Sequence, residues 1–198
     1  EKKLSIVIKD EIIFFSNNLG DVTALDVYNG TLVWQTPTQT NTIYQNAFSL
    51  ENSDLVFAND SIYFSNNKNE LFSINARTGT INWKQTVNSS LIPIIIEDLV
   101  ITISNEGYLF VIDNKNGNII RINNLLKNIK NKKNQIKTSG FVVARNKIYL
   151  SLNNGRIIKI DLTTGIEENI YKLSNSKILR PNIFSDKMYL LKNNAIIK

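Results

Sequence analysis

The chain has 198 residues, of which 42% are hydrophobic and 20% are charged, and it carries a net charge of +6 at pH 7. It contains no Cys and no His, which excludes disulfides, cysteine nucleophiles, Cys-ligated zinc and histidine acid–base catalysis. No apolar run approaches the roughly 20 residues that a membrane-spanning helix needs, so the composition predicts an ordinary globular domain.

The N-terminal part of the chain predicts a meander of four short strands. Polar turns separate four mostly apolar runs: Ser5–Ile8, Ile12–Ser16, Val22–Leu25 and Thr31–Trp34. Asp26 can accept backbone N–H bonds from the residues that follow it, and Gly30 can adopt the positive φ that closes such a turn. Short strands joined by tight turns predict antiparallel hairpins.

The same unit recurs along the chain. The segment Gly20–Trp34 has counterparts at Asn69–Trp83, Gly107–Arg121 and Gly155–Asn169. A fifth unit begins with Ile183-Phe184 and Met188–Leu190. The intervals between equivalent turn positions are 49, 38, 48 and 40 residues. Four short strands repeated about every 44 residues indicate a β-propeller.

The inner strands of each unit are apolar at consecutive positions, as in Leu109–Ile112, which is typical of sheets buried on both faces. We therefore predict an all-β protein, a partial β-propeller of four-stranded antiparallel blades. About four and a half blades are expected in a single domain, residues 1–198. The predicted blades are residues 1–36, 52–86, 91–123, 138–171 and 178–198.

Seven of the eight glycines fall at the two repeated turns of the unit: Gly20, Gly30, Gly79, Gly107, Gly117, Gly155 and Gly165. We interpret them as structural turn residues, because neither a dinucleotide-binding nor a P-loop glycine pattern is present. A catalytic interpretation would group the four repeated side chains Asp26, Asn75, Asp113 and Asp161. We interpret these instead as turn caps, one in each blade.

Two segments carry a family motif. Leu25–Trp34 reads Leu-Asp-x-x-x-Gly-x-x-x-Trp, and Ile74–Trp83 reads Ile-Asn-x-x-x-Gly-x-x-x-Trp. This motif resembles the repeat of the PQQ-like, quinoprotein-type β-propeller family, and the resemblance implies part of an eight-bladed ring. The third and fourth units keep the Asp and the Gly but have Arg121 and Asn169 in place of the Trp.

Within this family, a chain of bare repeats is most similar to the BamB-like scaffold lipoproteins of the outer-membrane β-barrel assembly machinery. The similarity implies a non-catalytic periplasmic scaffold whose protein partner is the central barrel-assembly protein of the outer membrane. It also implies a lipid anchor, although this chain has no N-terminal Cys. Because Lys198 falls within a hairpin of the fifth unit, we expect either continuation that completes the ring or association of two copies.

Trp34 and Trp83 occupy one position of the repeat. The resemblance implies that they dock between adjacent blades, where each would bury a large aromatic surface. The alternative is a ligand-binding aromatic box, and no polar constellation in the sequence accompanies it.

A basic segment, Asn123–Lys137, is longer than a blade connection requires. Between Asp113 and Asp161 there are eleven Lys or Arg residues and no acidic one. We expect either a solvated loop or a loop whose apolar side chains contact a partner while its lysines attract an acidic surface. The candidate contacts are Leu125, Leu126, Lys127, Ile129, Lys130, Lys132 and Lys133.

Two further expectations concern partners. Nucleic acid is not expected, because no aromatic residue interleaves the lysines as a stacking platform would require. Leu179 and Arg180 resemble the Leu-Arg loop through which BamB-like proteins contact their barrel partner, which makes them additional candidate contacts.

Three function classes follow from these observations. The first is a non-catalytic scaffold with no cofactor and no metal. The second is the propeller portion of a quinoprotein dehydrogenase, for which the family implies a vicinal Cys pair and a quinone and calcium site. The third is an unrelated propeller adaptor.

Overall fold

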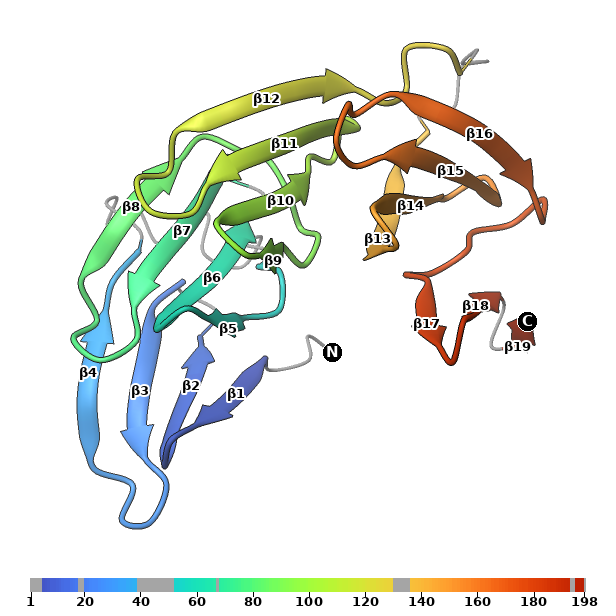
Figure 1. Cartoon of the computed structure of the whole chain (residues 1–198). Coiled ribbons are helices and arrows are strands. Elements are labelled where there is room, and N and C mark those ends of the chain that lie inside the picture. Colours follow the sequence, from blue (N-terminus) through green and yellow to red (C-terminus); the bar gives the residue numbers. More distant parts are fainter. Residues whose placement is uncertain are drawn as a thin grey trace. The chain divides into compact units, whose positions relative to one another are not determined.

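The computed structural model describes residues 5–17, 20–38, 52–66, 68–129, 136–192 and 195–197, and the described part consists of strands and turns. It has no helix long and apolar enough to cross a membrane within these ranges. The strands form five antiparallel sheets, each a meander in chain order (Figure 1). The prediction of an all-β fold built from four-stranded antiparallel blades is confirmed.

The first two sheets have four strands each. The first consists of β1 (Ile6–Lys9), β2 (Ile12–Ser16), β3 (Val22–Asp26) and β4 (Leu32–Thr36). The second consists of β5 (Val56–Ala58), β6 (Ser61–Asn66), β7 (Glu70–Asn75) and β8 (Ile81–Gln85).

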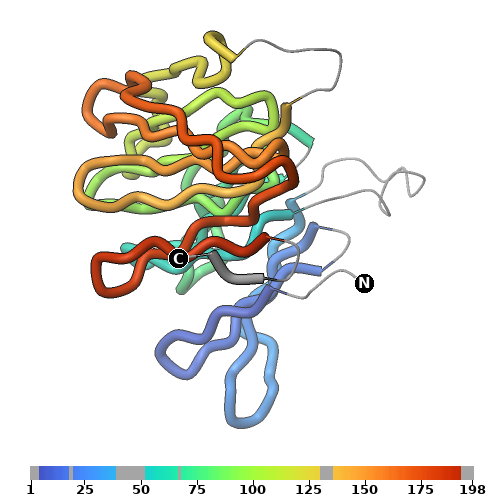
Figure 2. Tube along the Cα trace, turned by 90° about the vertical axis from the view of Figure 1, so that its right-hand side faces the viewer, coloured from blue at the N-terminus to red at the C-terminus, as the bar shows by residue number. Residues whose placement is uncertain are grey.

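The next two sheets repeat this plan. The third consists of β9 (Ile94–Ile96), β10 (Leu99–Ile103), β11 (Tyr108–Asp113) and β12 (Ile119–Asn124). The fourth consists of β13 (Thr138–Ala144), β14 (Lys147–Leu152), β15 (Arg156–Asp161) and β16 (Glu167–Lys172). The fifth has three strands, β17 (Asn182–Phe184), β18 (Lys187–Lys192) and β19 (Ala195–Ile197), and Figure 2 traces the same hairpins along the Cα path.

Contacts divide the chain into two compact units. One comprises Glu1–Leu99 with Asp113–Asn118, and the other comprises Val100–Ile112 with Ile119–Lys198. In the first unit, side chains of the first two sheets form one apolar cluster that includes Phe14, Trp34, Ile62 and Phe72. In the second, Ile157, Ile178 and Leu190 form a smaller cluster.

The central strands are buried on both faces, as the apolar runs predict. All six residues of β6 are buried, whereas Trp83 is the one buried residue of β8. Both faces of such a strand are covered, so the polar side chains that it buries, such as Tyr63 and Ser65, are hydrogen-bonded.

The turn between the third and fourth strands has the same side-chain cap in each four-stranded sheet. Asp26 Oδ1 accepts hydrogen bonds from the backbone N–H groups of Tyr28 and Asn29 at 2.9 and 3.0 Å. Asn75 and Asp113 cap their own turns in the same way, and Asp161 accepts from the N–H of Thr164. Each of these side chains is therefore engaged within its own hairpin.

The turn between the first and second strands uses non-glycine residues in the left-handed region. Asn59 and Asp60 have φ of 48° and 54°, and Asp10 and Glu11 have φ of 47° and 67°. Two consecutive residues with positive φ match the type I′ turn, whose twist fits a two-residue hairpin. Short polar side chains such as Asn and Asp tolerate this region best, which accounts for the polar residues at these turns.

Candidate functional site

Trp34 and Trp83 join consecutive sheets of the first unit. Each side chain is buried, and each indole Nε1 donates to a backbone carbonyl of the next sheet: Trp34 to Ala76 at 2.9 Å and Trp83 to Asn114 at 2.8 Å. Each indole ring also packs on the glycine of the turn that contains this carbonyl, Gly79 for Trp34 and Gly117 for Trp83. A Cβ atom added to Gly117 would lie 2.7 Å from Cδ2 of Trp83.

The same geometry explains why glycine occupies this turn position. Gly117 has a φ of 73°, where a side chain is strained, and the indole leaves no room for a Cβ atom. Gln85 Nε2 adds a 2.7 Å bond to the Gly117 carbonyl. Neither Trp lines the pocket described below, so the arrangement supports the docking interpretation.

Arg121 occupies the Trp position of the third sheet and makes an analogous contact within the second unit. Its Nη2 donates to the carbonyl of Leu162 at 2.6 Å, and its Nη1 donates to the carbonyl of Thr163. Leu162 follows Asp161 as Asn114 follows Asp113, so Arg121 and Trp83 donate to the carbonyl at the same position of the repeat. The sequence shows Arg121 at the Trp position of the motif, but the contact that it makes could not be predicted from that position alone.

The basic segment is described only in part. Leu125 and Ile129 are buried, Leu126 is half-buried and Lys127 is exposed. Leu126 packs on Gly107, where an added Cβ atom would overlap the Leu126 Cγ atom. Lys130, Lys132 and Lys133 lie outside the described residues. A partner contact through this segment stays a prediction, and among the described candidates Lys127 is the exposed one.

Leu179 and Arg180 lie in the connection between β16 and β17. Leu179 is 44% exposed, and its backbone N–H donates to the Leu191 carbonyl at 3.1 Å. Arg180 Nε donates to the Phe141 carbonyl at 3.2 Å, and its Cα lies 2.6 Å from the position of a Cβ on Gly140. Arg180 is thus held against β13, while the Leu179 side chain faces solvent.

An ion-pair cluster crosses three strands of the fourth sheet. Lys147 on β14 contacts Asp161 at 2.7 Å and also Glu168, and Lys159 contacts Glu168 at 3.0 Å. The hydrogen bond from Lys147, with the backbone N–H and hydroxyl of Thr164, lowers the pKa of Asp161 to about 2. Lys147 in turn has its pKa raised, first by Asp161 and then by Glu168.

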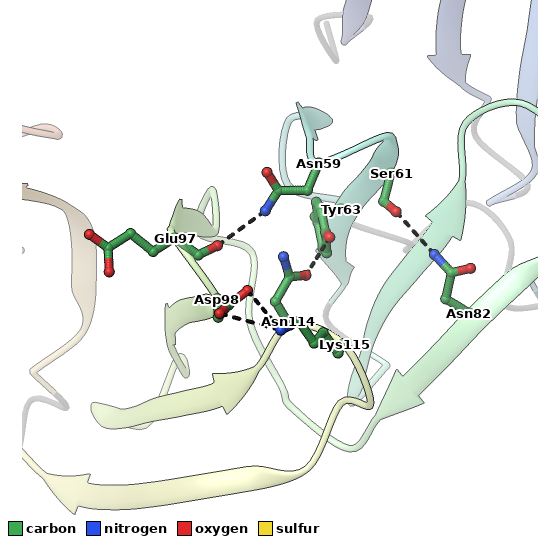
Figure 3. Close-up of a pocket in the computed structure, with 8 residues that line it drawn as sticks. All are labelled: Asn59, Ser61, Tyr63, Asn82, Glu97, Asp98, Asn114 and Lys115. Carbon is green, nitrogen blue, oxygen red and sulfur yellow. Dashed lines mark hydrogen bonds and ion pairs between the residues drawn. The ribbon is translucent and has the colours of Figure 1, made fainter.

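A polar pocket of about 420 Å³ opens in the first unit, at the end of the second sheet where its turns lie (Figure 3). Its lining residues are Asn59, Ser61, Tyr63, Asn82, Glu97, Asp98, Asn114 and Lys115. The Tyr63 hydroxyl donates to Asn114 Oδ1 within the lining, and both side chains are buried. This pocket could not be predicted from the sequence, because its residues come from three turns and two strands that are far apart in the chain.

Several residues that line the polar pocket bond to one another. Asn59 Nδ2 donates to the Glu97 carbonyl at 3.1 Å, and Asn82 Nδ2 donates to Ser61 Oγ at 3.1 Å. Lys115 pairs with Asp98 at 3.5 Å on the exposed rim. Lys115 and Asp98 offset each other, and Figure 3 shows the Glu97 carboxylate turned away from them, so the pocket carries little net charge.

The residues present do not fit a quinone cofactor with its calcium ion. In the described ranges there is no group of three or more His, Cys, Asp or Glu side chains that could hold a metal ion. Calcium needs several oxygen ligands that include carboxylates.

These features define a propeller-type repeat protein in which a Trp or Arg of one sheet bonds to a turn of the next sheet. The family model described as "Outer membrane protein assembly factor BamB" matches residues 2–123, more than half of the chain. The chain belongs to this family of PQQ-like propeller repeats, which confirms the resemblance drawn from the motif. A search of curated proteins found no match.

Solved structures agree on the fold. BamB from Moraxella catarrhalis has a TM-score of 0.74 at 14% identity, over 98% of this chain and 56% of that protein. The computationally designed Ika8 protein has a TM-score of 0.73 at 12% identity, over 98% of this chain and 57% of that one.

A quinohemoprotein alcohol dehydrogenase from Comamonas testosteroni is also similar. Its TM-score is 0.68 at 14% identity, over 94% of this chain and 39% of that enzyme. The chain spans little more than half the length of the first two structures and less of the enzyme. At these identities the likeness shows the fold alone.

Proposed function

We propose that the protein is a non-catalytic scaffold that binds other proteins during the assembly of β-barrel proteins into the bacterial outer membrane. The observation that carries the proposal is the match of residues 2–123 to the BamB family. We propose the periplasm as its location and the central barrel-assembly protein as its partner.

Leu179 is the proposed contact most open to test. Its side chain is 44% exposed while its backbone is held by a hydrogen bond, so a substitution alters the surface without disturbing the strand pairing. Arg180, which is held by the Phe141 carbonyl, orients the same segment.

Binding of the purified chain to the purified barrel-assembly protein tests the proposal. We expect saturable binding by biolayer interferometry and at least about fivefold weaker binding for Leu179→Asp, because the substitution places a charge in an apolar contact. Leu173→Asp is the matched control, since Leu173 is 46% exposed on the same unit. Absence of binding by the unmodified chain would contradict the proposed partner.

The alternative is the propeller portion of a quinoprotein dehydrogenase, and the similarity to the quinohemoprotein alcohol dehydrogenase favours it. Reconstitution with pyrroloquinoline quinone and calcium separates the two classes. A stoichiometric quinone absorbance that survives gel filtration would support the enzyme, and free elution of the quinone would support the scaffold.

A further inference from the structure

A second pocket lies in the second unit and has a volume of about 250 Å³. We call it the tyrosine pocket, and its lining residues are Tyr149, Ile157, Lys159, Tyr171, Leu173 and Met188. Ile157 belongs to the apolar cluster of this unit, and Tyr149 and Met188 pack against that cluster. Tyr171 and Leu173 are 42% and 46% exposed. The pocket therefore has an apolar inner wall and a rim that solvent reaches.

The first two sheets show what fills the corresponding place. Trp34 lies in one cross-strand row with Phe14, and their ring centroids are 5.8 Å apart. Trp83 lies in the same row of the second sheet with Tyr63, and these centroids are 6.1 Å apart. In both sheets, an aromatic side chain of the second strand therefore has an indole ring as its neighbour.

The fourth sheet keeps the aromatic side chain of this row and lacks the indole. The row consists of Tyr149, Lys159 and Asn169, so Asn169 occupies the Trp position. Tyr149 has no ring partner among the described residues. One wall of the tyrosine pocket is thus the counterpart of a surface that an indole covers in the first two sheets.

The next row along the strands changes in the same direction. Its outer residue is Thr36 in the first sheet and Gln85 in the second, and each donates to a glycine carbonyl of the following turn. Tyr171 occupies this position in the fourth sheet and lines the pocket. A second phenol ring therefore replaces a hydrogen-bonding side chain at the rim.

This lining favours a neutral aromatic ring. Two phenol rings and the Met188 thioether make favourable contacts with the face or edge of an aromatic guest. The Lys159 ammonium is 3.0 Å from the Glu168 carboxylate, so an anionic ligand would have to displace that ion pair. The volume lies below the roughly 300–1,000 Å³ of pockets for larger ligands, which suits a single ring system.

We propose that the tyrosine pocket binds a neutral aromatic ring of the size of indole. The ring can belong to a free molecule or to a side chain of a peptide segment, and the experiment below distinguishes these sources. Leu179, the proposed contact for the barrel-assembly protein, does not line this pocket. The inference therefore goes beyond the proposed scaffold function.

Methyl NMR of the 198-residue chain tests the inference, because Met188 is its one methionine and gives a single ε-methyl signal. The probes are indole and the peptide acetyl-Gly-Gly-Trp-Gly-Gly-amide, with cyclohexanol, glucose and the corresponding Leu peptide as non-aromatic comparisons. We expect indole to move the Met188 signal upfield in a saturable way, since the methyl group would lie beside the ring. Cyclohexanol and the Leu peptide should bind at least about fivefold more weakly.

Asn169→Trp restores the indole of the earlier rows. We expect this variant to fold with an unchanged or higher melting temperature and to bind indole at least about fivefold more weakly, because its own ring would pack beside Tyr149. Asn169→Ala is the matched control and should bind as the parent does. Leu173→Asp should also weaken binding at least about fivefold, because it places a charge at the rim beside the ring. Leu179→Asp, outside the lining, should leave indole binding unchanged.

The remaining outcomes assign the source of the ring or overturn the inference. Tighter binding of the Trp peptide than of indole would assign the ring to a protein side chain, and tighter binding of indole would assign it to a small molecule. No saturable shift, equal affinity for cyclohexanol or the Leu peptide, tighter binding of glucose, or unchanged binding by both Asn169→Trp and Leu173→Asp would each overturn the inference. The assay contains no barrel-assembly protein, so its failure leaves the scaffold function standing.

Discussion

Trp83 joins two sheets through an apolar ring and one polar atom. Its ring is buried beside Tyr63 and Gly117, and its Nε1 donates to Asn114. Trp83→Ala should lower the free energy of unfolding by about 3–5 kcal/mol, because a large cavity replaces the ring. Guanidinium denaturation measures the change.

Trp83→Phe separates the two contributions. Phenylalanine retains most of the buried ring and removes the donor, so we expect a smaller loss, of about 1–2 kcal/mol. If both variants matched the parent in stability, the ring would not be part of the contact between sheets.

Arg121 makes the corresponding contact with a charged group. Arg121→Ala removes two donors from the carbonyls of Leu162 and Thr163 and should destabilise the protein by about 1–3 kcal/mol. Arg121→Lys should restore only part of this, because an ammonium lacks the planar fork that reaches two carbonyls. Arg156→Ala, on β15 of the same unit, is the control for loss of an arginine, and an equal effect there would refute the specific role.

At the scale of the hairpin, two glycines with similar φ have different surroundings. Gly30 and Gly117 have φ of 69° and 73°, but a Cβ on Gly30 meets no atom within 4 Å. Gly30→Ala should cost about 1 kcal/mol, the strain of a left-handed alanine. Gly117→Ala should cost about 1–3 kcal/mol more, because its Cβ would overlap Trp83.

Thermal or chemical unfolding of the two variants measures the difference. Trp83→Ala made in the Gly117→Ala background should remove most of the extra cost, because the added Cβ atom then has no indole ring to overlap. Equal destabilisation at Gly30 and Gly117 would mean that close packing of the indole adds nothing to the turn.

The ion-pair cluster of β14 to β16 gives the fourth sheet a defined pH dependence. Asp161 has its pKa lowered from 3.8 to about 2, so its ionised form stabilises the folded state above pH 4. That contribution is lost as the pH falls from 4 to 2. Lys147 has a raised pKa, so its contribution is present below pH 10.5 and is lost above it.

Asp161→Asn tests the loss of this stabilisation at acid pH. Asn75 shows that an amide can cap this turn, so the variant should fold and lose only the ion pair. The stability difference from the parent should be constant between about pH 5 and pH 9 and should shrink below pH 4. Asp113→Asn, a turn cap with no lysine partner among the described residues, is the control, and a parallel pH profile for both variants would refute the assignment.

For the molecule as a whole, the features that recur in every sheet could be predicted from the sequence. Hairpin turns, strand order and burial of both faces followed from spacing, because local turn chemistry and strand periodicity are encoded within a few residues of each other. The family resemblance led us to expect contacts between neighbouring sheets at Trp34 and Trp83, and each indole bonds to a carbonyl of the next sheet.

The features that could not be predicted depend on contacts between side chains that are far apart in the sequence. The polar pocket combines Tyr63 of β6 with Asn114 of a later turn, which lies 51 residues further along the chain. Burial of Leu125 and Ile129 likewise depends on how their segment folds back, and an apolar pattern does not distinguish a buried contact from an exposed one. Such features depend on three-dimensional neighbours that no single stretch contains.

Net charge acts at the largest scale, because a protein of charge +6 attracts an acidic partner over the Debye length. The cations of the basic segment should contribute most if they lie at the contact. Replacing Lys130, Lys132 and Lys133 with Gln should slow association with the barrel-assembly protein and flatten its salt dependence, while leaving the melting temperature unchanged.

A second triple variant distinguishes local from global charge. Lys9, Lys177 and Lys187 are exposed lysines outside the basic segment, and their replacement by Gln lowers the net charge by the same amount. Stopped-flow association rates at several salt concentrations compare the two. A larger effect of the first variant places the basic segment at the contact, because charge at the interface is screened least. Equal effects would assign the steering to net charge alone, and no effect of either would remove electrostatic attraction from partner capture.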